Sequence, residues 1–101
     1  MRYILDNKIY DTEKSKLIIK YTASVETIGF LTTYPEYEHT LYKSPKGQFF
    51  VHIGKYVGTS YLGYHDKDYI ELASEASVKR ILQKLNLIDL YKELFGDLEE
   101  G

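Results

Sequence analysis

Two β-like runs flank the sequence SPKGQ, positions 44–48, in the middle of the chain, and apolar residues recur at every second position from Phe49 to Ile53. Alternation with a period of two residues is typical of a β-strand that buries one face. Pro45 suits the first central position of a type I turn, and Gly47 can adopt the positive φ of a bulge after it. The pattern predicts a β-hairpin whose buried face holds four apolar side chains: Leu41, Phe49, Val51 and Ile53.

The length of this turn decides whether two histidines face each other. A bulged turn that pairs Ser44 with Gln48 places His39 opposite Ile53, whereas a two-residue loop would place His39 opposite His52. The shorter loop would also divide the apolar set between the two faces. We therefore expect the bulged turn and no histidine pair.

The N-terminal segment predicts a second hairpin, because RYIL and KIY flank Asp6 and Asn7, two residue types that tolerate left-handed backbone. Asp11 or Thr12 then predicts the N-cap of a short helix. The apolar side of that helix consists of Leu17, Ile18 and Tyr21. Residues 22–33 show no clear period and predict a loop that leads into a strand.

The C-terminal part predicts a last strand over YIELA, residues 69–73, followed by two helical segments. Ser74 is a good N-cap, Asn86 interrupts the helical pattern and Gly96 ends it. The apolar positions at helical spacing are Val78, Ile81, Leu82 and Leu85, then Leu87, Leu90, Tyr91, Leu94 and Phe95. We expect an α+β fold in which a short antiparallel sheet, with the N-terminal hairpin and short helix, packs against the C-terminal helices.

Composition is that of one folded domain over residues 1–101, with 44% hydrophobic and 28% charged residues. The absence of cysteine excludes disulfides and thiolate chemistry. No apolar run approaches the roughly 20 residues of a membrane span, and MRYILDNKIYD lacks the pattern of a signal peptide, so we expect a cytoplasmic protein.

Candidate catalytic and metal-binding patterns are incomplete. The candidates are the histidines His39, His52 and His65, the paired carboxylates Glu36 and Glu38, and the acidic group Asp66, Asp68 and Glu71. The histidines lack the i, i+4 spacing of a zinc protease, and the acidic group lacks the glycine and the terminal glutamate of a calcium loop. A chain this small also offers little cleft for the sugar that paired carboxylates would cleave. We expect neither enzymatic activity, nor a metal site, nor a cofactor.

The stretch GKYVGTSYLGYH, residues 54–65, combines glycines with tyrosines. Its glycine spacing fits neither a P-loop nor a dinucleotide-binding loop. One interpretation is a long connection whose aromatic side chains fold back onto the sheet. The other is a contact loop, in which at least two of Tyr56, Tyr61 and Tyr64 are substantially exposed as anchors for a partner.

Charge is distributed unevenly, although the formal net charge is only −2. Positive residues gather in the first twenty positions: Arg2, Lys8, Lys14, Lys16 and Lys20. Negative residues gather near the C-terminus: Glu93, Asp97, Glu99 and Glu100. The two ends of the chain therefore suit partners of opposite charge.

Four segments carry a resemblance that covers most of the chain: YILDNKIYDTEKSKLI, TLYKSPKGQFFVH, IELASEASV and YKELFGDLEE. They resemble a group of small uncharacterised proteins from bacteriophages and conjugative elements of AT-rich Gram-positive bacteria. The chain differs from that group after the central hairpin, where it reads GKYVG. The shared motifs are turns, caps and core positions, so the resemblance implies a fold and a mobile-element origin, without an assigned chemistry.

Mobile-element proteins of this size commonly act by binding. The resemblance therefore implies an anti-CRISPR-like inhibitor that binds a host protein, a nucleic-acid-targeting defence complex such as Cas9, and occludes its channel or locks its conformation. The expected partner-binding residues are Tyr56, Tyr61, Tyr64, Asp66, Asp68, Glu93, Asp97, Glu99 and Glu100. The alternative is a small DNA- or RNA-binding accessory protein that uses the basic N-terminal region on phosphates.

Overall fold

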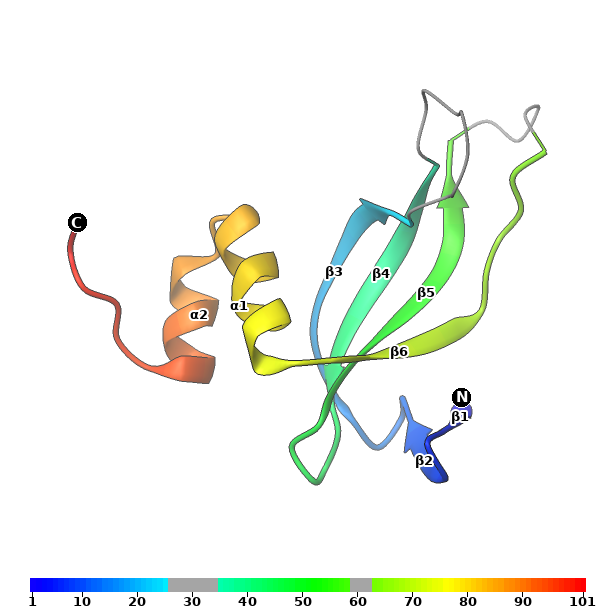
Figure 1. Ribbon diagram of the computed structural model, residues 1–101, viewed down its shortest axis with the longest axis horizontal. Helices are drawn as coiled ribbons and strands as arrows, with labels where there is room; N and C mark the ends of the chain where they lie inside the picture. Colours follow the sequence, from blue (N-terminus) through cyan, green and yellow to red (C-terminus); the bar gives the residue numbers. More distant parts are fainter. Residues whose placement is uncertain (26–34, 59–62) are drawn as a thin grey trace.

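The computed structural model describes residues 1–25, 35–58 and 63–101. It has an α+β fold with two antiparallel sheets and two C-terminal helices (Figure 1), which confirms the predicted fold class. The elements are β1 (Arg2–Leu5), β2 (Lys8–Asp11), β3 (Lys16–Ser24), β4 (Glu36–Lys43), β5 (Phe49–Val57), β6 (Tyr69–Ala73), α1 (Glu75–Lys84) and α2 (Ile88–Phe95). Strands β1 and β2 form one hairpin, and β3 to β6 form a sheet in which each strand pairs with its neighbours in sequence.

The predicted register of the central hairpin is confirmed. The Ser44 amide donates to the Gln48 carbonyl at 2.8 Å, and Gly47 has a φ of +90°. His39 lies opposite Ile53, and the partner of His52 is Thr40. The expected apolar set is buried on one face: Leu41, Phe49, Val51 and Ile53.

The C-terminal helices pack on that face of the sheet. Val78 and Leu82 of α1 are buried in the same cluster as the four strand residues. Ser74 caps α1, because its hydroxyl accepts a hydrogen bond from the Ser77 amide at 3.1 Å. Asn86, with a φ of +55°, separates α1 from α2 as expected.

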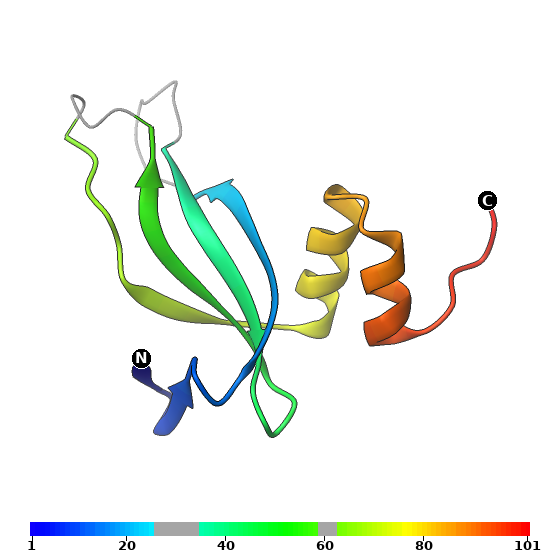
Figure 2. The ribbon, with the colours of Figure 1, turned by 180° about the vertical axis from the view of Figure 1, so that it is seen from behind.

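The N-terminal hairpin covers part of the other face. Tyr10 and Phe50 are buried there with ring centroids 5.2 Å apart, together with Ile70. Figures 1 and 2 show the helices beside β3 and the hairpin below β6. The central strands β4 and β5 are therefore covered on both faces over part of their length.

The predicted short helix after Asp11 is wrong, because residues Lys16–Ser24 form strand β3. The capping interactions predicted for Asp11 do form, but no helix follows them. The Asp11 carboxylate accepts a hydrogen bond from the Glu13 amide at 3.0 Å, and the Asp11 carbonyl accepts one from the Ser15 hydroxyl at 2.8 Å. These bonds form one turn. The following residues then pair with β4 along their whole length, with a bulge between Leu17 and Ile19, and this long-range pairing overrides the helical spacing.

The segment predicted as a loop over residues 22–33 begins inside β3, and residues 26–34 lie outside the described residues. Within the described ranges, no helix has the length and apolarity needed to cross a membrane.

Candidate binding surface on the N-terminal hairpin

The turn between β1 and β2 fixes which hairpin residues face the sheet. Asp6 and Asn7 have φ values of +52° and +61°, as a two-residue hairpin turn requires. In this register Ile4 lies opposite Ile9, and Tyr3 lies opposite Tyr10. Because neighbouring residues point to opposite faces, the tyrosine pair faces the sheet and the isoleucine pair faces away from it.

A hydrogen-bonded clamp fastens the hairpin to the sheet. The Tyr3 hydroxyl donates to Asp68 Oδ1 at 2.6 Å, and His52 Nε2 lies 2.7 Å from the same oxygen. The Tyr3 and His52 rings are also in contact, with centroids 5.4 Å apart. The clamp thus joins β1, β5 and the residue directly before β6.

The protonation behaviour of the clamp favours a structural role. Burial, together with the hydrogen bond to Asp68, raises the pKa of Tyr3 to about 12. The hydrogen bonds from Tyr3 and His52 lower the pKa of Asp68. Tyr3 therefore stays protonated as a donor and Asp68 stays ionised as an acceptor at neutral pH.

The outer face of the hairpin carries an exposed apolar pair. Ile4 is 81% exposed and Ile9 is 58% exposed, and the two lie directly across from each other. Their backbone is held by strand pairing, and the opposite face of the hairpin is packed on Phe50. A fixed apolar surface of this kind favours contact with a partner.

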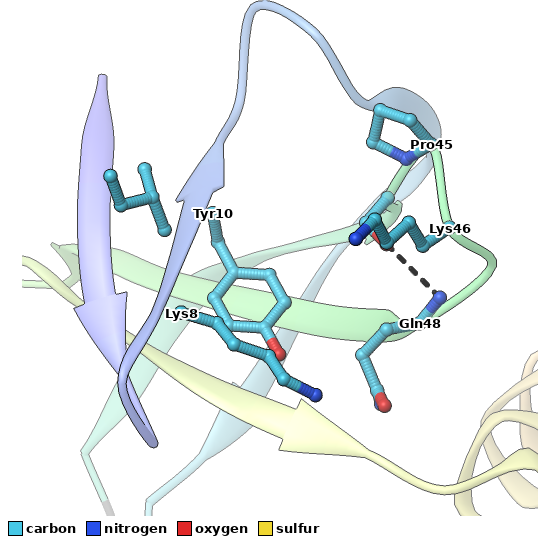
Figure 3. Close-up of a pocket in the computed structure, with 7 residues that line it drawn as sticks. Lys8, Tyr10, Pro45, Lys46 and Gln48 are labelled. Carbon is cyan, nitrogen blue, oxygen red and sulfur yellow. Dashed lines mark hydrogen bonds between the residues drawn. The ribbon is translucent and has the colours of Figure 1, made fainter.

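A hollow of about 400 Å³ lies between the hairpin and the β4–β5 turn (Figure 3). Its lining consists of Lys8, Ile9, Tyr10, Ser44, Pro45, Lys46 and Gln48. An adjoining hollow of about 240 Å³ shares four of these residues and adds Arg2, Asp11, Lys14 and Ser15. Figure 3 shows Lys8 and Tyr10 on the hairpin side of the hollow and Pro45, Lys46 and Gln48 on the side of the turn.

The charged residues that line the two hollows are predominantly basic. Arg2, Lys8, Lys14 and Lys46 contribute positive charge, against the single carboxylate of Asp11. Within the described part of the chain, no ion pair involves any of these four cations. The basic N-terminal region was evident from the sequence. Lys46 was missed, because only the tertiary packing brings the central turn beside the hairpin.

The tyrosines of the predicted contact loop are packed more closely than expected. Tyr56 and Tyr64 are half-buried, with ring centroids 5.4 Å apart, and Tyr56 also contacts the Tyr37 ring at 5.7 Å. Tyr61 lies outside the described residues. Because neither Tyr56 nor Tyr64 is fully exposed, the expectation that at least two of the three rings are substantially exposed is not confirmed. Their role in partner binding stays a prediction.

The predicted acidic contacts fall into three groups. Asp66 and Asp68 make contacts within the chain: Asp66 Oδ1 accepts from the Tyr56 amide at 2.9 Å, and Asp68 belongs to the clamp. Glu93 forms an exposed ion pair with Lys16 at 3.4 Å. The remaining three, Asp97, Glu99 and Glu100, are exposed after the end of α2.

The three histidines occupy different environments. His39 is buried, with Nδ1 2.8 Å from the Tyr37 carbonyl, whereas His52 belongs to the clamp and His65 is exposed. Among the residues that the structure describes, no three His, Cys, Asp or Glu side chains form a group that could hold a metal ion.

Comparison of the chain with protein-family models, with curated proteins and with solved structures gives no match. The resemblance inferred from its motifs therefore stays a prediction.

Proposed function

We propose that this protein acts by binding: it is a mobile-element inhibitor that contacts a host nucleic-acid-targeting defence complex through the outer face of its N-terminal hairpin. The observation that carries the binding proposal is the exposed Ile4–Ile9 pair, held on a clamped hairpin. The motif resemblance alone supports the class of partner, a CRISPR nuclease such as Cas9.

The composition of the hairpin surface suits a protein partner. Interfaces commonly have an apolar centre and a polar rim, and a few central residues contribute most of the binding free energy. Here Ile4 and Ile9 supply the apolar centre, Arg2 lies on the same face of the hairpin, and Lys14 follows directly after the hairpin. The positive rim favours an acidic surface around an apolar depression on the partner.

The hairpin is also placed to bind without rearrangement. Its turn, its strand pairing and its contacts with Phe50 and Asp68 are all formed in the free protein. A pre-organised contact surface loses little conformational entropy on binding. Inhibition then follows if the bound protein blocks the nucleic-acid channel or holds the complex in an inactive conformation.

The test is cleavage of target DNA by a purified Cas9–guide complex, with increasing amounts of this protein. We expect the wild type to inhibit cleavage. The double variant Ile4→Ser/Ile9→Ser should raise the half-inhibitory concentration by about 30-fold or more, as loss of roughly 2 kcal/mol at a central contact implies. The matched control is Ile88→Ser, which changes an apolar residue that is 51% exposed on α2 and should inhibit like the wild type.

Folding is checked separately, because Ile4 and Ile9 are exposed and their replacement should leave the circular dichroism spectrum and melting temperature nearly unchanged. Absence of inhibition by the wild type would contradict the Cas9 assignment. Equal inhibition by the wild type and the double variant would contradict the hairpin as the contact surface.

A second candidate function, binding of DNA or RNA, is favoured by the position of Lys46. The central turn adds this cation to Arg2, Lys8 and Lys14 around the hollows, so four positive charges lie on one side of the molecule. Phosphate contacts of this type are sensitive to salt.

Binding of a labelled oligonucleotide, titrated at several salt concentrations, tests this candidate. Lys46→Gln should reduce the slope of log affinity against log salt by about one unit, whereas Ile4→Ser should leave the slope unchanged. Lys84→Gln on α1 is the matched control. No binding at low salt would contradict a nucleic-acid partner.

A further inference from the structure

We propose that the basic hollow between the hairpin and the β4–β5 turn binds the acidic C-terminal tail, residues 96–101, of a second copy of this chain. The proposal is independent of the proposed function, because it concerns the purified protein alone. The protein would then self-associate through two different surfaces, because the tail of one molecule binds in the hollow of another.

The tail combines three carboxylates with one apolar side chain. Gly96, with a φ of +95°, ends α2, and the sequence then reads Asp97, Leu98, Glu99, Glu100. All of these residues are exposed, and Leu98 is 44% exposed. Beyond Gly96, the tail belongs to no helix or strand, so it can adopt an extended conformation on a partner surface.

The hollow matches the tail in charge and in apolar character. Ile9, Tyr10 and Pro45 provide an apolar lining, and Lys8 and Lys46 stand at its borders (Figure 3). Leu98 fits the apolar lining, while the carboxylates on either side of it fit the two ammonium groups. A volume of about 400 Å³ accommodates one or two side chains.

The occupant is a second copy because the tail and the hollow of one chain lie far apart. Figures 1 and 2 show the tail leaving α2 on the side away from the sheet, with both helices between the tail and the sheet. Glu93 of α2 pairs with Lys16, which holds the end of this helix beside β3. The tail of another molecule meets no such obstacle.

Docking of this kind has consequences for assembly. A tail that enters the hollow of another copy is a heterologous contact, which either closes when two molecules exchange tails or continues along a series of molecules. The tail would also compete with an outside partner, because Ile9 belongs both to the hollow and to the exposed isoleucine pair. Charge pairing at an exposed site is weakened by salt.

Sedimentation velocity of the purified protein at low and high salt tests the proposal. We expect the average mass of the wild type to rise with concentration at low salt and to fall to that of the monomer at high salt. The variant Lys8→Glu/Lys46→Glu should be monomeric at low salt, and so should Glu99→Lys/Glu100→Lys.

The decisive measurement is the mixture of these two variants. Each hollow then faces a tail of opposite charge, so the mixture should associate although each variant alone does not. The tail variant lies beyond the last helix, so its folding does not depend on the changed residues. A matched control, Lys84→Glu/Lys92→Glu, reverses two exposed charges on the helices and should associate like the wild type.

Three results would overturn the proposal: a wild type that stays monomeric at every concentration at low salt, association that survives reversal of the tail charges, or a mixture of the two variants that remains monomeric. Each is independent of whether the protein inhibits a nuclease.

Discussion

At the residue scale, Gly47 occupies a backbone conformation that side chains with a Cβ rarely adopt. Its φ is +90°, and an added Cβ would meet only Lys43 Cε, at 4.0 Å. Backbone strain, rather than a collision, therefore sets the cost of substitution. We expect Gly47→Val to lower the free energy of unfolding by about 1–3 kcal/mol, as measured by urea denaturation.

The control for this prediction is Lys46→Val, which introduces the same β-branched side chain one position earlier in the turn, where φ is not positive. An unchanged urea midpoint for Gly47→Val would contradict the role of the bulged turn.

Ionisation of Asp68 makes the stability of the protein depend on pH in the acidic range. Its pKa is lowered in the folded state, chiefly by the hydrogen bonds from Tyr3 and His52, so folding favours the ionised carboxylate. The resulting stabilisation is complete above the pKa of the unfolded chain, about 4, and is lost as the pH falls through the lower folded value. We expect Asp68→Asn to be less stable than the wild type at neutral pH. Its melting temperature should also fall less than that of the wild type as the pH is lowered below 5.

Two variants make the measurement specific. Tyr3→Phe removes one donor from the clamp and keeps the ring beside His52, so it should show a smaller effect of the same sign. Asp97→Asn changes an exposed carboxylate of the tail and should keep the wild-type pH profile. Parallel profiles for the wild type and Asp68→Asn would exclude the clamp as the source of the acid dependence.

At the element scale, α1 depends on a single side-chain cap. The Ser74 hydroxyl accepts from the Ser77 amide, one of the amides at the start of a helix that has no partner within the helix. We expect Ser74→Ala to lower the free energy of unfolding by about 1 kcal/mol, and Ser74→Gly by only a few tenths. Thermal unfolding followed by circular dichroism at the helical band measures the difference, with Gln83→Ala on the exposed side of α1 as the control. Equal stability of the wild type and Ser74→Ala would show that the cap is dispensable.

At the scale of the whole molecule, stability should be highest in β4 and β5. These two strands contribute the most completely buried large side chains of the sheet, Leu41, Phe50 and Ile53, and other elements cover them on both faces. By contrast, α2 contains no fully buried residue. We expect native-state hydrogen exchange to be slowest for the paired amides of β4 and β5 and fastest, among the regular elements, for α2. Protection of α2 equal to that of β5 would contradict this order.

The sequence by itself determined the turns, the helix start and the helix break of this fold, because the interactions that form them are local. Asp6–Asn7 and Pro45–Gly47 specify two turns, Ser74 specifies a helix start, and Asn86 specifies a helix break. Each signal acts within a few residues, through φ preferences or a hydrogen bond to a nearby amide. The alternating pattern beside the central turn then fixed the register, because a slip of one residue would move every apolar side chain to the wrong face.

Only the tertiary structure decided the features that join distant segments. Leu17, Ile18 and Tyr21 have helical spacing but lie in β3, because pairing with β4 supplies more contacts than an isolated helix could. Asp68, whose role as a partner contact stays a prediction, accepts hydrogen bonds from Tyr3 and His52 within the chain. Lys46 joins the basic hairpin because Tyr10 packs on Phe50 and brings the β4–β5 turn beside it. These arrangements depend on which elements pack against one another after the sheet has formed. The residue pattern along a single strand does not specify that packing.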